Sequence, residues 1–115
     1  MLTDMQLRAL EPTGKIYKVA DQQGLYAAVT PTGVISFRFD YRIHGRRETL
    51  FMERYDSLRG ARQSRDASAL AYGQAVTMAE ARLLLGRARR SVDLGESPSR
   101  AKIDKRLEAE QRRTP

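Results

Sequence analysis

The chain has 115 residues, with 21 lysines and arginines against 14 aspartates and glutamates, and a formal net charge of +7. This length suits a single domain, and the basic excess makes nucleic acid the first candidate partner, ahead of an acidic protein or a membrane surface. The lack of cysteine excludes disulfides and thiolate zinc sites and favours a cytoplasmic, nucleoid-associated location, and no apolar run is long enough to cross a bilayer.

The first ten residues carry the pattern of a short helix. Thr3 and Gln6 have the spacing of a capping box, in which each side chain satisfies a backbone N–H at the start of a helix. A helix is therefore predicted over residues 4–10. The turn-forming residues 11–14 end it, and residues 15–20 are expected to form a short extended segment.

Two runs of alternating apolar and polar residues flank the dipeptide His44-Gly45. The alternation over residues 34–44 predicts a strand with one buried face. A tight turn needs a residue that tolerates positive φ beside a glycine, so residues 47–54 should return antiparallel. With a first strand at residues 24–30, the expected sheet is a three-stranded antiparallel meander.

This hairpin sorts the side chains onto two faces of the sheet, because successive strand residues point in opposite directions. The core face should carry the apolar side chains Ile35, Phe37, Phe39, Tyr41, Ile43, Leu50 and Met52. The opposite face should carry Arg38, Arg42, Arg47, Thr49 and Phe51.

The strongest helix signal lies in the second half of the chain. Thr77 and Glu80 form a second capping box, and Gly95 is placed just after the C-terminus of the helix. Its apolar stripe consists of Met78, Ala81, Leu84, Leu85, Ala88 and Val92. Residues 56–75, low in bulky apolar side chains, are predicted to be a loop with a helical turn around 67–72.

A thinner, charged helix is expected at the C-terminal end. Ser97 and Pro98 suit the N-cap and first helical position, and the apolar stripe that follows is too narrow to bury firmly. The predicted fold class is thus α+β: a three-stranded antiparallel β-meander packed against one long α-helix, with a short N-terminal helix and a C-terminal connector helix.

The sequence contains no recognisable arrangement of catalytic or metal-binding residues. His44 is the only histidine, and without cysteines or carboxylates at ligand spacing a role in the hairpin turn is favoured over metal binding. The sequence has no nucleophile motif and no phosphate-cradling glycine pattern. We therefore expect no catalysis, metal, cofactor or small-molecule substrate.

The basic residues remain as the functional candidates, in two clusters. Arginine suits both phosphate oxygens and the guanine edge, and a two-stranded β-ribbon can enter the major groove. Pattern alone leaves open a second interpretation, in which the charges serve solubility and Asp40 and Glu48 pair with arginines across strands. The clusters are Arg38, Arg42, Arg46 and Arg47 on the sheet and its turn, and Arg82, Arg87, Arg89 and Arg90 on the long helix. For the helix cluster a solvated face is favoured over phosphate contact.

Several ordered motifs carry a family resemblance. They are L-T-D-x-x-L-R-A-L, K-x-Y-K-V-A-D-x-x-G-L-Y, V-T-P-T-G, S-F-R-F-D-Y-R-I-H-G-R-R-E-T-L and M-A-E-A-R, at residues 2–10, 15–26, 29–33, 36–50 and 78–82. Together they resemble the N-terminal arm-type DNA-binding domain of tyrosine-recombinase integrases from prophages and genomic islands. The resemblance implies a three-stranded sheet with a helix packed on it, the sheet turned toward the major groove of arm-type sites.

Two departures from the family pattern shape the expected domain layout. Most relatives pass from the third strand to M-A-E-A-R through a short G-x-Y-P-D turn, whereas this chain inserts residues 56–75. The insertion could cover the sheet edge, contact DNA through Arg59, Arg62 and Arg65, or be disordered. The recombinase domain is missing, so none of the family's catalytic residues carries over, although the full-length parent would be a tyrosine recombinase. The layout is a DNA-binding domain at 1–95 and a connector at 96–115.

The expected function is sequence-specific binding of double-stranded DNA at arm-type attachment sites, as the N-terminal part of a phage or prophage integrase in site-specific recombination. Base-reading candidates are Arg38, Arg42 and Thr49, and phosphate-contact candidates are Arg46, Arg47, Lys15, Lys18, Arg89 and Arg90. Partners would be DNA and other integrase protomers. The alternative is a protein–protein interaction module of an integrase assembly with only non-specific DNA affinity.

Overall fold

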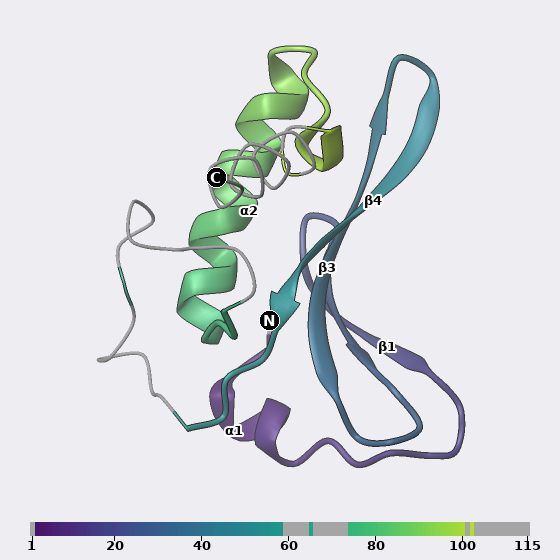
Figure 1. Ribbon diagram of the computed structural model, residues 1–115, viewed down its shortest axis with the longest axis vertical. Helices are drawn as coiled ribbons and strands as arrows, with labels where there is room; N and C mark the ends of the chain where they lie inside the picture. Colours follow the sequence, from purple (N-terminus) through teal and green to yellow (C-terminus); the bar gives the residue numbers. More distant parts are fainter. Residues whose placement is uncertain (1, 59–64, 66–73, 101, 103–115) are drawn as a thin grey trace, which may run out of the picture.

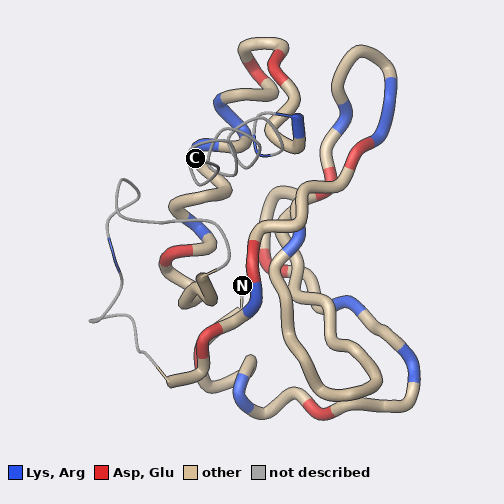
Figure 2. Tube along the Cα trace, viewed as in Figure 1, with Lys and Arg blue, Asp and Glu red and all other residues tan. Residues whose placement is uncertain are grey.

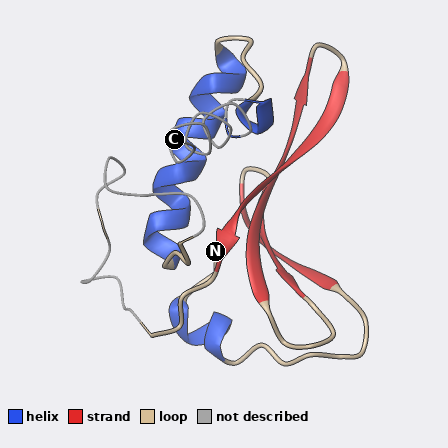
Figure 3. Cartoon of the chain, in the orientation of Figure 1, coloured by secondary structure: helices blue, strands red, loops and turns tan. Residues whose placement is uncertain are grey.

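A computed structural model describes residues 2–58, 65, 74–100 and 102 of the chain. The elements in order are α1 (Asp4–Arg8), β1 (Tyr17–Gln22), β2 (Leu25–Val29), β3 (Ile35–Ile43), β4 (Arg46–Arg54) and α2 (Met78–Asp93). The strands form one antiparallel sheet in the order β1-β2-β3-β4. Both labelled helices lie on the same side of this sheet, which gives a two-layer α+β fold (Figures 1 and 3).

The sheet has four strands, so the prediction of three was wrong by one edge strand. The segment expected only as an extended piece forms β1, which pairs along β2 from Tyr17↔Val29 to Gln22↔Leu25. A positive φ at Gln23 and Gly24 makes the turn between them. A side chain at Gly24 would lie 2.6 Å from the Asp40 carbonyl oxygen, so glycine is required there.

The hairpin of β3 and β4 forms as predicted. His44 and Gly45 both have positive φ, 51° and 76°, as a two-residue hairpin turn of the I′ type requires. Phe39 pairs with Leu50 and Arg38 with Phe51, and the register is irregular between Arg38 and Phe37. Leu50 and Met52 are buried and Phe51 is exposed, which confirms the predicted faces.

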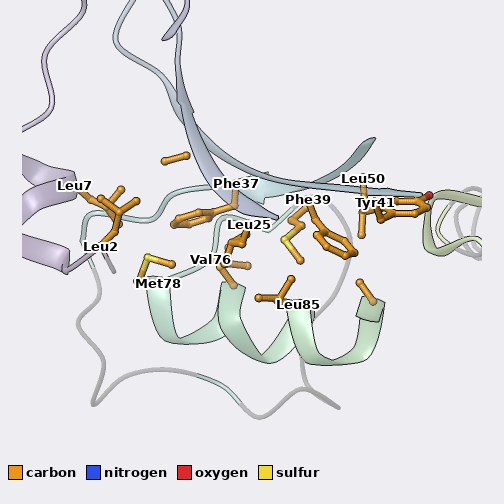
Figure 4. Packing of buried hydrophobic residues seen from close by; sticks show 14 of the residues in the cluster. Leu2, Leu7, Leu25, Phe37, Phe39, Tyr41, Leu50, Val76, Met78 and Leu85 are labelled. Carbon is orange, nitrogen blue, oxygen red and sulfur yellow. The ribbon is translucent and has the colours of Figure 1, made fainter. Parts of the chain in front are cut away.

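The hydrophobic core lies between the helices and the inner face of the sheet, the face that carries Phe37 and Phe39 (Figure 4). Phe37 and Leu25 are buried there against Val76 and Leu85, which lie just before and within α2. Leu7 of α1 joins the same cluster and is fully buried. The capping box of α1 is present as predicted, but the helix ends at Arg8.

The long helix α2 begins and ends where the sequence predicted. Thr77 and Glu80 form the capping box, and Gly95, with φ 78°, follows the C-cap residue Leu94. The buried positions Met78, Ala81, Leu85 and Ala88 match the predicted stripe, with Leu84 and Val92 partly buried against the core.

The ends of the inserted segment are fastened together beside β4. Asp56 N–H donates to the Val76 carbonyl and Val76 N–H to the Arg54 carbonyl, each at 2.8 Å. The helical turn predicted at 67–72 lies outside the described residues. The connector helix begins at Pro98, capped by Ser97, whose hydroxyl accepts from Arg100 N–H at 3.2 Å; its course beyond residue 102 is outside the described part of the chain.

Candidate nucleic-acid interface

The sheet face turned away from α2, called here the outer face, carries most of the predicted sheet cations. Cross-strand pairing aligns Lys18 with Ala28, Tyr26 with Arg38, Arg38 with Phe51, Asp40 with Thr49, and Arg42 with Arg47. Neither α1 nor α2 covers this face (Figure 1). The alternation along β3 produces the segregation, because its apolar residues point into the core and its charged residues point outward.

Asp40 is the hydrogen-bonding centre of the outer face. Its Oδ1 accepts from the Thr49 hydroxyl at 2.7 Å and from the Tyr26 hydroxyl at 3.1 Å, and its Oδ2 accepts from Arg47 Nη2 at 3.0 Å. Burial alone would raise the pKa of Asp40, but the hydrogen bonds from Thr49, Arg47 and Tyr26 outweigh it and hold the pKa below its usual range. Burial and the Asp40 carboxylate together raise the pKa of Tyr26.

Arg38 lies in the middle of the outer face, between Tyr26 of β2 and Phe51 of β4. Its Nε is buried, and within the described part of the protein this nitrogen has no hydrogen-bond partner. An unpaired donor in a guanidinium is costly unless a ligand satisfies it. Arg38 therefore carries an unsatisfied donor at the centre of the outer face.

Arg42 and Arg47 form a like-charge pair near the hairpin tip. They lie directly opposite each other, an arrangement that destabilises an isolated sheet. Asp40 compensates Arg47 through a salt bridge, although the Arg47 side chain remains 70 % exposed. Arg42 is exposed and has no ion pair among the described residues, so its charge is available to an anionic ligand.

The predicted lysines occupy different places. Lys18 lies on the outer face, with its Nζ 4.9 Å from the centre of the Tyr26 ring, in cation–π contact. Lys15 is exposed and precedes β1, outside the sheet. Of the two, only Lys18 shares the outer face of the sheet with the arginines.

The hairpin register separates Arg46 from Arg47. Arg46 pairs with Ile43, and Glu48 pairs with Tyr41, so both lie on the inner side of the hairpin. Of the two acidic residues that the second interpretation pairs with arginines across strands, Asp40 does so, with Arg47. Glu48 instead accepts from the hydroxyls of Tyr41 at 2.6 Å and Ser97 at 2.7 Å.

These contacts join the start of the connector to the edge of β4. The hydrogen bond from Tyr41 and then that from Ser97 lower the pKa of Glu48. Ser99 donates to the Thr49 carbonyl at 3.2 Å, and Lys102 donates to the Met52 carbonyl at 3.3 Å. The connector thus satisfies backbone groups that an edge strand leaves unpaired.

The basic residues of α2 lie on the other side of the sheet (Figure 2). Arg82 forms a salt bridge with Asp21 at 3.0 Å, and Arg89 donates to the Gln23 side chain. Arg90 is exposed in the last turn. The structure therefore brings together Lys18, Arg38, Arg42, Arg47 and Thr49 on one face, and leaves Lys15, Arg46, Arg89 and Arg90 away from it.

Sequence reasoning missed the two residues that organise the outer face. The sequence pattern offers Asp40 only as a partner for arginines and assigns no role to Tyr26. Their contact depends on how β2, β3 and β4 align, and the alternation of a single strand does not reveal that alignment. The available signal was an acidic residue at the centre of an otherwise basic strand face.

The described residues contain no cluster of three potential metal ligands. Within the same described ranges, no helix combines the length and apolar character needed to span a bilayer. His44 lies in the hairpin turn, where its Nε2 is 3.1 Å from the Gly95 carbonyl oxygen.

A small α+β domain with an open, basic sheet face has the arrangement of proteins that read DNA with a β-sheet. Residues 2–105 match the family of arm DNA-binding domains, and the chain belongs to that family. It is therefore a non-catalytic DNA-binding module of the integrase type. Comparison with curated proteins finds none that matches the chain.

Proposed function

We propose that this domain binds double-stranded DNA sequence-specifically at arm-type attachment sites, as the N-terminal part of a phage or prophage integrase. The observation that carries the proposal is the concentration of Arg38, Arg42 and Arg47 on a sheet face that neither α1 nor α2 covers. The membership of the arm DNA-binding family supports the same assignment.

The hairpin of β3 and β4 has a suitable shape for the major groove. A two-stranded ribbon fits a groove about 12 Å wide, and side chains on its outer face then point toward base edges. We assign base readout to Arg38, Arg42 and Thr49. We assign phosphate contacts to Arg47 at the hairpin and to Lys18 of β1, on the same face of the sheet.

The remaining candidate cations suit the rim of the interface. Arg46 lies at the hairpin tip, and Lys15 precedes β1, so both could reach phosphates beside the groove. Arg89 and Arg90 lie on α2, on the opposite side of the sheet, and would contact a DNA backbone that curves past the edge of the sheet. Phosphate contacts of this kind position a protein without specifying sequence.

The test begins with selection of bound duplexes from a randomised library by the 115-residue chain, followed by anisotropy titrations of the selected duplex across salt concentration. Binding through arginine–phosphate contacts should weaken linearly in log affinity against log salt, with a slope of about 0.9 per phosphate neutralised. The double variant Arg38→Ala, Arg42→Ala should bind the selected duplex at least tenfold more weakly, from the loss of about 1 to 3 kcal/mol at each base contact.

Arg8→Ala is the control, since Arg8 is exposed in α1, away from the sheet; it removes one positive charge, whereas the double variant removes two. It should keep the selectivity of the wild-type chain. Unchanged affinity of the double variant would rule out the outer face as the reading surface. Salt-insensitive association between copies of the chain, with only non-specific DNA affinity, would favour the protein-interaction alternative.

The integrase context has its own test in the reading frame beyond Pro115. A tyrosine-recombinase domain encoded downstream would place this chain at the head of a site-specific recombinase acting in the bacterial cytoplasm with other protomers. A downstream domain of another class would remove the recombination role and leave the DNA-binding assignment in place.

A further inference from the structure

Asp40 controls which atoms of the outer face can donate hydrogen bonds. At neutral pH its lowered pKa keeps the carboxylate ionised, so it accepts hydrogen bonds and donates none. Every partner of Asp40 must therefore turn a proton toward it. The three partners are Thr49, Tyr26 and Arg47, at 2.7, 3.1 and 3.0 Å.

Among the three partners, Thr49 is the one whose hydrogen bonding to a ligand is most restricted by Asp40. A threonine hydroxyl has one proton and two lone pairs, and the short contact with Asp40 Oδ1 uses the proton. The Thr49 residue is exposed, unlike Tyr26, which is only 8 % exposed. Towards a ligand on the outer face, the Thr49 oxygen is thus an acceptor.

The base edges of the major groove differ in what they offer such an acceptor. Adenine presents its N6 amino group and cytosine its N4 amino group, which are hydrogen-bond donors. Guanine and thymine present acceptors in the corresponding region, and would face the lone pairs of the threonine oxygen. An oxygen that can only accept hydrogen bonds therefore distinguishes adenine and cytosine from guanine and thymine.

We propose that Asp40 is a positioning residue for base readout: by holding the Thr49 proton, it makes Thr49 an acceptor that selects adenine or cytosine at one position of the bound DNA. This inference rests on the proposed binding of DNA by the outer face. Asp40 also holds Arg47, so the carboxylate limits non-specific attraction to phosphate while it fixes the orientation of two contact residues.

Selection from a randomised duplex library, run in parallel on wild type, Asp40→Asn, Thr49→Ser and Thr49→Val, tests the proposal. Wild type and Thr49→Ser should favour adenine or cytosine at one position by about five-fold, the worth of one hydrogen bond. Thr49→Val should lose that preference. Asp40→Asn should lose it too, because an amide at this position can donate to Thr49 and release the hydroxyl proton.

A substitution in the DNA gives a second test that leaves the protein intact. At the selected position, adenine is replaced by purine, which lacks the 6-amino group, or cytosine by the analogue without its 4-amino group. Wild type should lose about five-fold in affinity, since one hydrogen bond disappears. Thr49→Val should bind both duplexes equally, because it has no acceptor oxygen to face the base.

Asp93→Asn is the charge control, because Asp93 is exposed at the end of α2 and its removal changes the net charge equally. It should keep the wild-type base preference. Asp40→Ala, which removes the carboxylate without adding a donor, is run beside Asp40→Asn, and thermal unfolding verifies that each variant folds. Retention of the wild-type preference in both Asp40 variants would overturn the inference while DNA binding stands. Failure of the wild-type chain to select any sequence would overturn the proposed function as well.

Discussion

Asp21 and Arg82 join three parts of the chain that are distant in sequence. The Asp21 side chain is fully buried, and that of Arg82 is 30 % exposed. Asp21 Oδ1 accepts from Leu2 N–H at 2.7 Å and from Arg82 Nη2 at 3.0 Å, and Arg82 Nη2 also donates to the Leu2 carbonyl. Burial would raise the pKa of Asp21, but the hydrogen bonds from Arg82 and Leu2 outweigh it and lower the pKa below 3.8.

Replacement of Arg82 by methionine should destabilise the fold by on the order of 3 kcal/mol at pH 7, because it leaves a buried carboxylate without its cation. The unfolded chain binds a proton at Asp21 more readily than the folded chain, so this pair stabilises the fold above pH 3.8 and the stabilisation is lost as the pH falls below it. Urea unfolding of wild type and variant between pH 7 and pH 3 measures the difference.

Arg90→Met, on the exposed side of the same helix, is the control and should cost less than about 0.5 kcal/mol. If the difference between wild type and Arg82→Met stays constant over this pH range, the carboxylate of Asp21 does not carry the interaction.

At the scale of elements, the chain contains two capping boxes of the same form in different surroundings. Thr3 and Gln6 of α1 are exposed, whereas Thr77 and Glu80 of α2 are fully buried. Glu80 Oε1 accepts from Thr77 N–H at 2.8 Å, and Oε2 accepts from the N–H and Nε of Arg65 at 2.8 and 2.9 Å. The buried box thus also anchors the inserted segment through Arg65, whose cation is paired within the protein.

Glu80→Gln should destabilise the chain by roughly 2 to 4 kcal/mol. The amide cannot accept all three hydrogen bonds, and the partly buried guanidinium of Arg65 loses its carboxylate partner. Gln6→Ala in the exposed box should cost only about 0.5 kcal/mol. Urea unfolding midpoints of the two variants measure the contrast. Equal losses would show that burial of the second box adds nothing.

Local signals predicted most of the elements, because each rests on a few neighbouring residues. The β3–β4 alternation, the His44-Gly45 turn and the two ends of α2 all follow from short-range preferences. The extended segment at β1 was expected, but its pairing into the sheet was not, because an edge strand with few bulky apolar residues is held in place by its contact with β2. Neither the burial of Glu80 nor the hydrogen bonds of Asp40 with Tyr26 and Thr49 could be predicted, because they depend on residues distant in sequence.

At the scale of the whole molecule, the start of the connector closes the β4 edge of the sheet. The Tyr41 hydroxyl lies 2.7 Å from the Ser99 hydroxyl, and Ser97 donates to Glu48. Lys102 forms a salt bridge with Glu53 at 3.2 Å. The family match likewise continues past residue 95, to residue 105.

A fragment of residues 1–95 should therefore be less stable than a fragment of residues 1–105, by roughly 2 to 4 kcal/mol, and should aggregate more readily through the uncovered β4 edge. Urea unfolding and light scattering of the two fragments measure these effects. The double variant Ser97→Ala, Ser99→Ala in the 115-residue chain should reproduce part of the loss. Identical unfolding midpoints for the two fragments would mean that the contacts of 97–102 contribute no stability.

The backbone hydrogen bonds that join Asp56 and Arg54 to Val76 determine how well this domain tolerates changes in the length of the inserted segment. Loop-closure entropy costs only about 0.6 kcal/mol for each doubling of loop length, once the ends of a loop are held together. The length of the segment between these ends can therefore vary at small thermodynamic cost, provided that Arg65 remains to pair with Glu80. Insertions and deletions among related sequences should accumulate here, and a fluorophore or affinity tag introduced here should leave both faces of the sheet intact.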